Sequence, residues 1–165
     1  MKERENDSFP RSGRDILIIG YGNEMRGDDG AGRRLADEVE SWRLDGVKTL
    51  SLRQLNPEVA AALSGKQHVV FVDATPETSR RMETRLPAPE TAEGRNATTH
   101  HCNPSRILTL ARQINGSAPP ATLITIPGER FGWEERLSPV ASANLDAALD
   151  AVRRLIRREK QTEGH

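Results

Sequence analysis

Apolar and polar positions follow one another along the chain in blocks that predict strands alternating with helices. Continuous apolar runs at 15–20 and 68–73 are typical of strands buried on both faces, and shorter runs predict strands at 47–52 and 123–126. Between the first two strands, apolar residues recur at the spacing of a helix, at Ala31, Leu35, Val39 and Trp42. This alternation predicts an α/β sandwich with a largely parallel sheet.

Prolines and glycines mark the ends of the other predicted helices. Asn56-Pro57, Asn103-Pro104 and Ser138-Pro139 each combine a capping residue with a proline suited to the first helical position. Ser64-Gly65 and Asn115-Gly116 are typical helix ends. A short segment, 82–86, is the fifth candidate strand.

The length of 165 residues is that of one ordinary domain. Residues 1–13 and 158–165 are polar and charged, which predicts a disordered N-terminal tail and a mobile C-terminal tail. We therefore expect a single α/β domain over residues 14–157.

Charge and hydropathy exclude several classes of partner. The 24 basic residues balance the 24 acidic ones, so no overall field attracts nucleic acid or anionic lipid. No apolar run approaches the roughly 18 to 20 residues of a membrane span. The polar N-terminus predicts no secretory signal, and the single Cys102 agrees with a reducing compartment. We therefore expect a cytoplasmic protein without nucleic-acid or membrane partners.

Candidate chemistry lies just after the predicted strands, where open α/β sheets bind their ligands. The loop after the first strand contains a glycine pair, which invites a dinucleotide-binding interpretation. Its spacing is not G-x-G-x-x-G, however, and Asp28 and Asp29 would place two carboxylates beside a pyrophosphate. The same helix N-terminus favours carboxylates, so the loop is better suited to a cation, and no nucleotide cofactor is expected.

A cation needs donors from several parts of the chain. Asp29, Asp73 after the third strand and a histidine from the Thr98–His101 segment offer two oxygens and one nitrogen. Three protein ligands leave coordination positions open, as in catalytic zinc or nickel-type sites.

Each candidate also has a structural explanation. Asp29 alone would be a stabilising carboxylate at a helix N-terminus, and Asp73 could pair with one of the many arginines. Asp28 and Asn23 are expected mainly to shape the loop. Glu129 follows the last strand and is a secondary candidate for lining the cleft, binding substrate or acting as a general base. Cys102 is not favoured as a nucleophile, because adjacency to His101 in sequence does not align a thiol with its base.

Taken together, these residues resemble one family, the hydrogenase maturation proteases, which process the large subunit of nickel-iron hydrogenases. The main match is Ile18-Ile-Gly-Tyr-Gly-Asn-Glu-Met-Arg-Gly-Asp-Asp-Gly-Ala-Gly32. Further matches follow in family order at Val69–Ala74, Thr99–Pro104, Ile124–Glu129 and Leu137–Pro139. The family's three metal-contacting positions fall on Asp29, Asp73 and a histidine, for which His100 is preferred and His101 is the alternative.

The resemblance implies a three-layer α/β/α sandwich with a mostly parallel five-stranded sheet, of the phosphorylase/hydrolase-like class. It also implies an endopeptidase that removes the C-terminal extension of a nickel-loaded hydrogenase large-subunit precursor, with nickel presented by that substrate. Metal-assisted hydrolysis by Asp29, Asp73 and His100 is the expected mechanism, and carboxylates acting as general bases are the alternative. A non-catalytic checkpoint or metallochaperone module for nickel-loaded precursor is the alternative outside enzymology.

Overall fold

The structure is a computed structural model that describes residues 15–76, 83–85 and 102–163. A short 3-10 turn, η1, and four helices accompany five strands. In chain order the elements are β1 Ile16–Tyr21, η1 Gly27–Gly30, α1 Ala31–Ser41, β2 Val47–Leu52, α2 Val59–Ala62, β3 His68–Thr75, β4 Glu83–Arg85, α3 Pro104–Asn115, β5 Ala121–Pro127 and α4 Pro139–Glu163.

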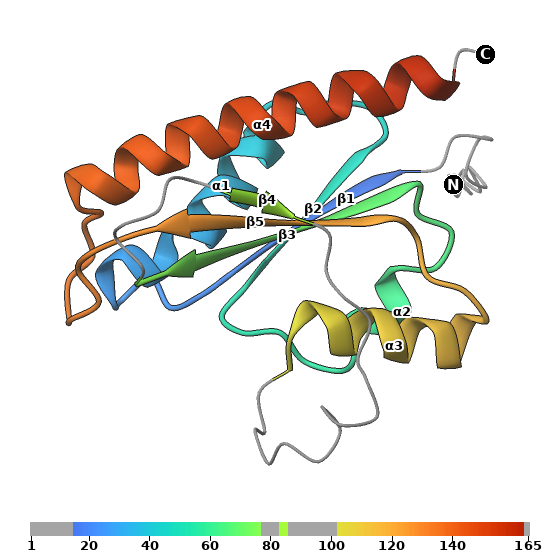
Figure 1. Cartoon of the computed structure of the whole chain (residues 1–165), viewed down its shortest axis with the longest axis horizontal. Helices are drawn as coiled ribbons and strands as arrows, with labels where there is room; N and C mark the ends of the chain where they lie inside the picture. Colours follow the sequence, from blue (N-terminus) through green and yellow to red (C-terminus); the bar gives the residue numbers. More distant parts are fainter. Residues whose placement is uncertain (1–14, 77–82, 86–101, 164–165) are drawn as a thin grey trace, which may run out of the picture.

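The strands form one mixed sheet in the order β2-β1-β3-β5-β4. Four strands are parallel, and the edge strand β4 runs antiparallel to β5. Helices α1 and α4 cover one face of the sheet, and α2 and α3 cover the other (Figure 1). The predicted three-layer sandwich with a mostly parallel five-stranded sheet is confirmed, including the short strand expected near 82–86.

Alternating residues of each central strand supply two separate cores. Ile16 and Ile18 of β1 pack with α1 and α4, whereas Leu17 and Ile19 pack with α2 and α3. This alternation is what a strand with two covered faces requires. The same alternation shows to which face of the sheet each polar side chain near a strand end points.

Two helix boundaries show how capping residues act in this chain. Asn103 accepts a hydrogen bond from the backbone N–H of Arg106 at 2.9 Å and begins α3, as predicted. The α2 helix begins at Val59, not at Pro57. The side chain of Asn56 accepts from the N–H of Glu58, and the N–H groups of Val59 and Ala60 bond to carbonyls three residues back, as in a turn.

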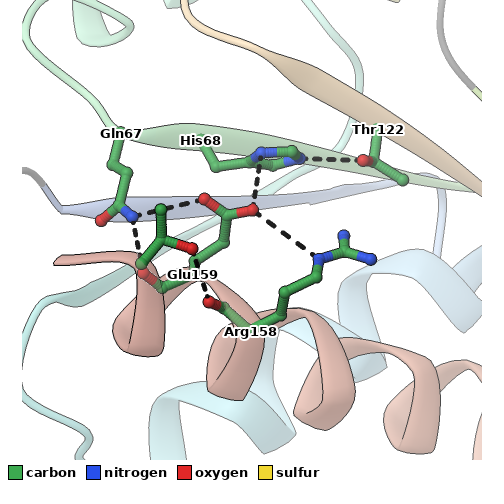
Figure 2. Close-up of polar contacts among 6 residues, drawn as sticks. Gln67, His68, Thr122, Arg158 and Glu159 are labelled. Atoms are coloured by element: carbon green, nitrogen blue, oxygen red, sulfur yellow. Dashed lines mark hydrogen bonds and ion pairs between the residues drawn. The ribbon is translucent and has the colours of Figure 1, made fainter. Parts of the chain in front are cut away.

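The last helix is longer than its predicted extent. It continues to Glu163, so the boundary expected at residue 157 falls inside α4. Figure 2 shows the anchor: Gln67 Nε2 donates to the backbone oxygen of Glu159 at 2.9 Å, and the Glu159 carboxylate faces His68. These contacts tie the end of α4 to the start of β3. The predicted N-terminal tail, 1–13, lies outside the described residues.

In the part of the chain that the structure describes, none of the helices combines the length and the hydrophobicity needed to cross a membrane.

Candidate active site

The glycines after β1 allow a strand and a helix to approach closely. The carbonyl of Gly32 in α1 occupies the space where a Cβ of Gly20 would lie, and the carbonyl of Asp29 does the same at Gly22. Gly22 also has a φ of +144°, which residues with a side chain rarely adopt. These glycines therefore allow β1 and α1 to cross at close range.

Asp28 is fully buried and holds the loop that follows β5. Its Oδ2 accepts from the backbone N–H of Glu129 at 2.7 Å and of Arg130 at 2.9 Å, and its Oδ1 accepts from the N–H of Ser138 at 2.7 Å. The Ser138 hydroxyl donates as well, at 2.6 Å. Burial raises the pKa of Asp28, but these hydrogen bonds outweigh it and the pKa is lowered. The expectation that Asp28 shapes the loop is confirmed.

Asp29, the next residue, is only partly buried and is held by a different contact. The backbone N–H of Asn23 donates to its Oδ2 at 2.8 Å. The side chain of Asn23 in turn accepts from the N–H of Met25 at 3.0 Å, which closes a tight turn, so its predicted role in shaping the loop is confirmed. One oxygen of Asp29 is thus oriented by the loop between β1 and η1.

Asp73 lies near the carboxyl end of β3, beside β1 on one side and β5 on the other. The neighbouring Val72 packs with α1 and α4, so Asp73 points to the face covered by α2 and α3. Tyr21, at the end of β1, belongs to that same face, and its side chain is hydrogen-bonded to Asp73. A polar pair therefore sits where two parallel strands end.

The pKa of Asp73 is raised to about 6. Burial is the main cause, and the charge of Asp29 is the second. The backbone N–H of Ala74 and the hydroxyl of Tyr21 act in the opposite sense, since both donate hydrogen bonds that favour the carboxylate. The pKa of Tyr21 itself is raised by burial and then by the charge of Asp73. Asp29 therefore lies close enough for its charge to affect Asp73.

Among the described residues, no basic side chain forms an ion pair with Asp73. These residues give no support to the alternative in which an arginine neutralises Asp73. The repulsion between Asp29 and Asp73 would be relieved by a cation, and two carboxylates fit the oxygen part of the predicted mixed site.

The candidates for the nitrogen ligand are His100 and His101. His100 and His101 lie outside the described residues, and within those residues no group of three or more His, Cys, Asp or Glu is placed to hold a metal. In the sequence both histidines directly precede Cys102, whose thiol lies close enough to Tyr21 to raise the pKa of its phenol. Cys102, the first described residue after them, thus lies near Tyr21.

The loop after β5 carries the remaining candidates. Glu129 is exposed, and its backbone N–H is bound to Asp28. Trp133 is 82% exposed on the same loop, whereas Phe131 is partly buried. A backbone hydrogen bond from Glu134 to the carbonyl of Met25, at 3.1 Å, joins this loop to the one that follows β1. The function of the Glu129 carboxylate stays a prediction.

Two residues of structural interest were missed by the sequence analysis. Tyr21 is the central residue of the Gly20-Tyr-Gly22 sequence, and the alternation along β1 would have placed it on the face of Asp73. His68, to which the sequence analysis gave no role, is buried, and its Nε2 lies 2.8 Å from the Thr122 hydroxyl. Its position at the start of a buried strand could have indicated that its side chain is buried and needs a polar partner.

Comparison with known proteins identifies the same fold in solved structures. No protein-family model and no curated protein matches the chain. Among solved structures, the chain is similar to the hydrogenase maturating endopeptidase HybD from Escherichia coli, with 22% identity over 87% of this chain and 93% of that one, at a TM-score of 0.68.

Two archaeal proteins have the same fold. The NiFe hydrogenase maturation protease HycI from Thermococcus kodakarensis is 21% identical over 88% of this chain and 94% of its own, at a TM-score of 0.67. The hydrogenase 2 maturation peptidase from Thaumarchaeota archaeon SCGC_AB-539-E09 is 23% identical over 87% and 98%, at a TM-score of 0.62. The chain therefore has the fold of the hydrogenase maturation endopeptidases over nearly its whole described length.

Proposed function

We propose that this protein is an endopeptidase that removes the C-terminal extension from a nickel-loaded precursor of a nickel-iron hydrogenase large subunit. Three observations support the proposal: the shared fold, the glycine-rich loop that carries Asp28 and Asp29, and the convergence of Asp29 with Asp73 at the carboxyl ends of the strands. Ligands of open α/β sheets bind at this edge.

The observation that carries the proposal is the unfavourable electrostatics of the Asp29 and Asp73 pair. Burial and a neighbouring negative charge both oppose ionisation of Asp73, and no basic partner compensates among the described residues. A purely structural site has no use for such an arrangement, because it lowers the stability of the fold. A divalent cation brought by the substrate would reverse the sign of this interaction.

In the proposed complex, nickel held by the precursor meets Asp29, Asp73 and a histidine, for which His100 is preferred over His101. When bound, the metal polarises the scissile carbonyl or activates a water molecule. The protein's own residues orient the ligands: the N–H of Asn23 holds Asp29, and the Tyr21 hydroxyl holds Asp73. Asp28 fixes the loop after β5 against the same site.

The test is the mass of the large subunit after incubation with the purified protein. Nickel-loaded and nickel-free precursors are each mixed with the wild-type protein and weighed by mass spectrometry. A loss of the C-terminal extension from the loaded precursor alone is expected. An unchanged mass in both samples would overturn the peptidase proposal and would favour the checkpoint or metallochaperone alternative.

Variants then test the residues. Asp29→Asn, Asp73→Asn and His100→Ala are each expected to abolish cutting, while His101→Ala is expected to retain it. The reverse result for the two histidines would exchange their roles. Asp150, an exposed acid on α4 paired with Arg153 at 3.1 Å, provides the control, and Asp150→Asn is expected to cut like the wild type.

A further inference from the structure

Asp73 has a second polar neighbour in the sheet, on the side away from Tyr21. In the β3 and β5 pairing, Asp73 is directly opposite Thr125. The flanking residues Ile124 and Ile126 pack with α1 and α4, so Thr125 points to the same face as Asp73. Side chains at such opposed positions have Cβ atoms about 5 Å apart. Tyr21, Asp73 and Thr125 thus form one polar row across β1, β3 and β5.

Within the part of the chain that the structure describes, the hydroxyl of Thr125 has no hydrogen-bond partner. Its oxygen is buried, and among the described residues nothing forms a hydrogen bond with it. Thr122, on the same strand but pointing to the opposite face, shows the ordinary situation, since its hydroxyl lies 2.8 Å from His68 Nε2. A buried hydroxyl without a hydrogen-bond partner destabilises a fold, so its presence in this one calls for an explanation.

The position of this hydroxyl limits what can bond to it. Because the oxygen is shielded from solvent, a group that arrives from outside does not reach it in this arrangement. Its partner must then be a neighbouring protein group that turns toward it. Two acids lie directly opposite Thr125 in the sheet, Asp73 on β3 and Glu83 on β4. Asp73 is the one that belongs to the candidate site, and its carboxyl group is held from the other side by Tyr21.

We propose that Thr125 is a positioning residue, whose hydroxyl donates a hydrogen bond to the Asp73 carboxylate when that carboxylate engages the cation of the substrate. Tyr21 then holds the carboxylate from the β1 side and Thr125 from the β5 side. This inference rests on the proposed function, because it concerns the occupied state of the same site.

The test uses three variants of the full chain. Thr125→Val keeps the shape of the side chain without its hydroxyl, Thr125→Ser keeps the hydroxyl, and Thr122→Val is the matched control on the same strand. Cutting of the nickel-loaded precursor, thermal melting and calorimetric titration with Ni²⁺ are measured for each. Thr125→Val is expected to cut about tenfold more slowly, as the loss of a hydrogen bond to a charged group implies, and to melt at or above the wild-type temperature.

The other variants separate this role from a structural one. Thr125→Ser is expected to restore most of the rate. Thr122→Val is expected to melt at a lower temperature and to cut at the wild-type rate, because its hydroxyl serves His68. Wild-type cutting by Thr125→Val, or slow cutting accompanied by a lower melting temperature, would overturn the inference.

Failure of the proposed function gives a different pattern. If the wild type does not cut either precursor, the inference is decided by Ni²⁺ affinity alone. An affinity about tenfold weaker in Thr125→Val, and restored in Thr125→Ser, would support the pairing with Asp73. Equal affinities, or no binding of Ni²⁺ by the wild type, would overturn the inference as well.

Discussion

Asp29 opposes the ionisation of Asp73 at the carboxyl ends of the central strands. Together with burial, which is the larger cause, it raises the pKa of Asp73 to about 6. The ionised Asp73 therefore destabilises the fold, and no basic side chain among the described residues neutralises it. Sites that are arranged for a ligand commonly contain such unfavourable contacts when the ligand is absent.

The first prediction concerns the stability cost of Asp73. Because its folded pKa lies above the unfolded value of 3.8, the ionised group destabilises the protein at pH 7.5, and stability rises as the pH falls through about 6 toward 3.8. Asp73→Asn should therefore increase the free energy of unfolding at pH 7.5 by about 1 to 2 kcal/mol, allowing for partial solvent screening. The same variant should not cut precursor.

Urea unfolding at pH 7.5 and pH 4.5 measures this effect. The gain from Asp73→Asn should shrink at the lower pH, where the wild-type carboxyl is already protonated. Asp150→Asn, at an exposed position, should change the stability little at either pH. A lower stability of Asp73→Asn at pH 7.5 would show that Asp73 has a stabilising partner.

The second prediction concerns Tyr21. Its hydroxyl lowers the pKa of Asp73, so Tyr21→Phe should raise that pKa further. If ionised Asp73 is needed for cutting, the pH at which half the activity is lost should move upward in the variant, and the rate at pH 7 should fall roughly tenfold. Rates of precursor cutting between pH 5 and pH 8.5 measure both. An unchanged pH profile with a uniformly lower rate would mean that Tyr21 acts only by packing.

Much of this architecture follows from the sequence because local signals agree with the tertiary structure. The apolar runs that became β1 and β3 are buried on both faces, and Asn103-Pro104 begins α3 as its composition indicates. The end of α4 was misjudged because the charged stretch after Arg157 looks solvated. The end of α4 is held by the hydrogen bond between Gln67 and Glu159, which are 92 residues apart in the sequence.

The site was only partly accessible to the same reasoning. Asp73 was recognisable because it ends an apolar strand, and the structure brings it near Asp29. Thr125 and Tyr21 give no signal as isolated residues, because their importance comes from the register that aligns them beside Asp73. Such cross-strand neighbours depend on the order of strands in the sheet, which residue spacing alone does not specify.

The third prediction compares two adjacent acids. Asp28 accepts four hydrogen bonds from the loop after β5, and Asn in its place has only one accepting oxygen. Asp28→Asn should therefore lower the free energy of unfolding by about 2 to 4 kcal/mol, since buried donors lose their partners. Asp29→Asn should lower it by less than about 1 kcal/mol while abolishing cutting.

Unfolding curves of the two variants, recorded together, check this contrast. The pKa of Asp28 is lowered in the fold, so its contribution is present above the unfolded pKa of 3.8 and is lost as the pH falls through the lower folded value. The stabilities of wild type and Asp28→Asn should consequently converge in strong acid. Equal losses for the two variants at pH 7 would contradict the assignment of Asp28 to loop structure.

The last prediction concerns His68 at the opposite end of the sheet. Burial lowers its pKa, the charge of Glu159 partly offsets this by raising it, and Arg158 lowers it further. Nδ1 lies 3.6 Å from the Glu159 carboxylate, within the contact that anchors α4 (Figure 2). Because the unfolded chain takes up a proton near pH 6.5 and the folded chain resists it, stability should fall as the pH drops below about 6.5.

Replacing His68 with Gln keeps a polar group facing Thr122 and removes the titration. The variant should be less stable than the wild type at pH 7.5, by about 1 to 2 kcal/mol, because the geometry at Thr122 is altered. Between pH 7.5 and pH 5.5 it should lose less stability than the wild type does. Asp73 contributes an opposite slope in this range, but it does so equally in both proteins, so the difference between their urea curves isolates His68. Parallel curves would show that folding leaves the pKa of His68 unchanged. A wild type that gains stability relative to the variant toward pH 5.5 would show that His68 is protonated in the folded protein, with Glu159 as its ionic partner.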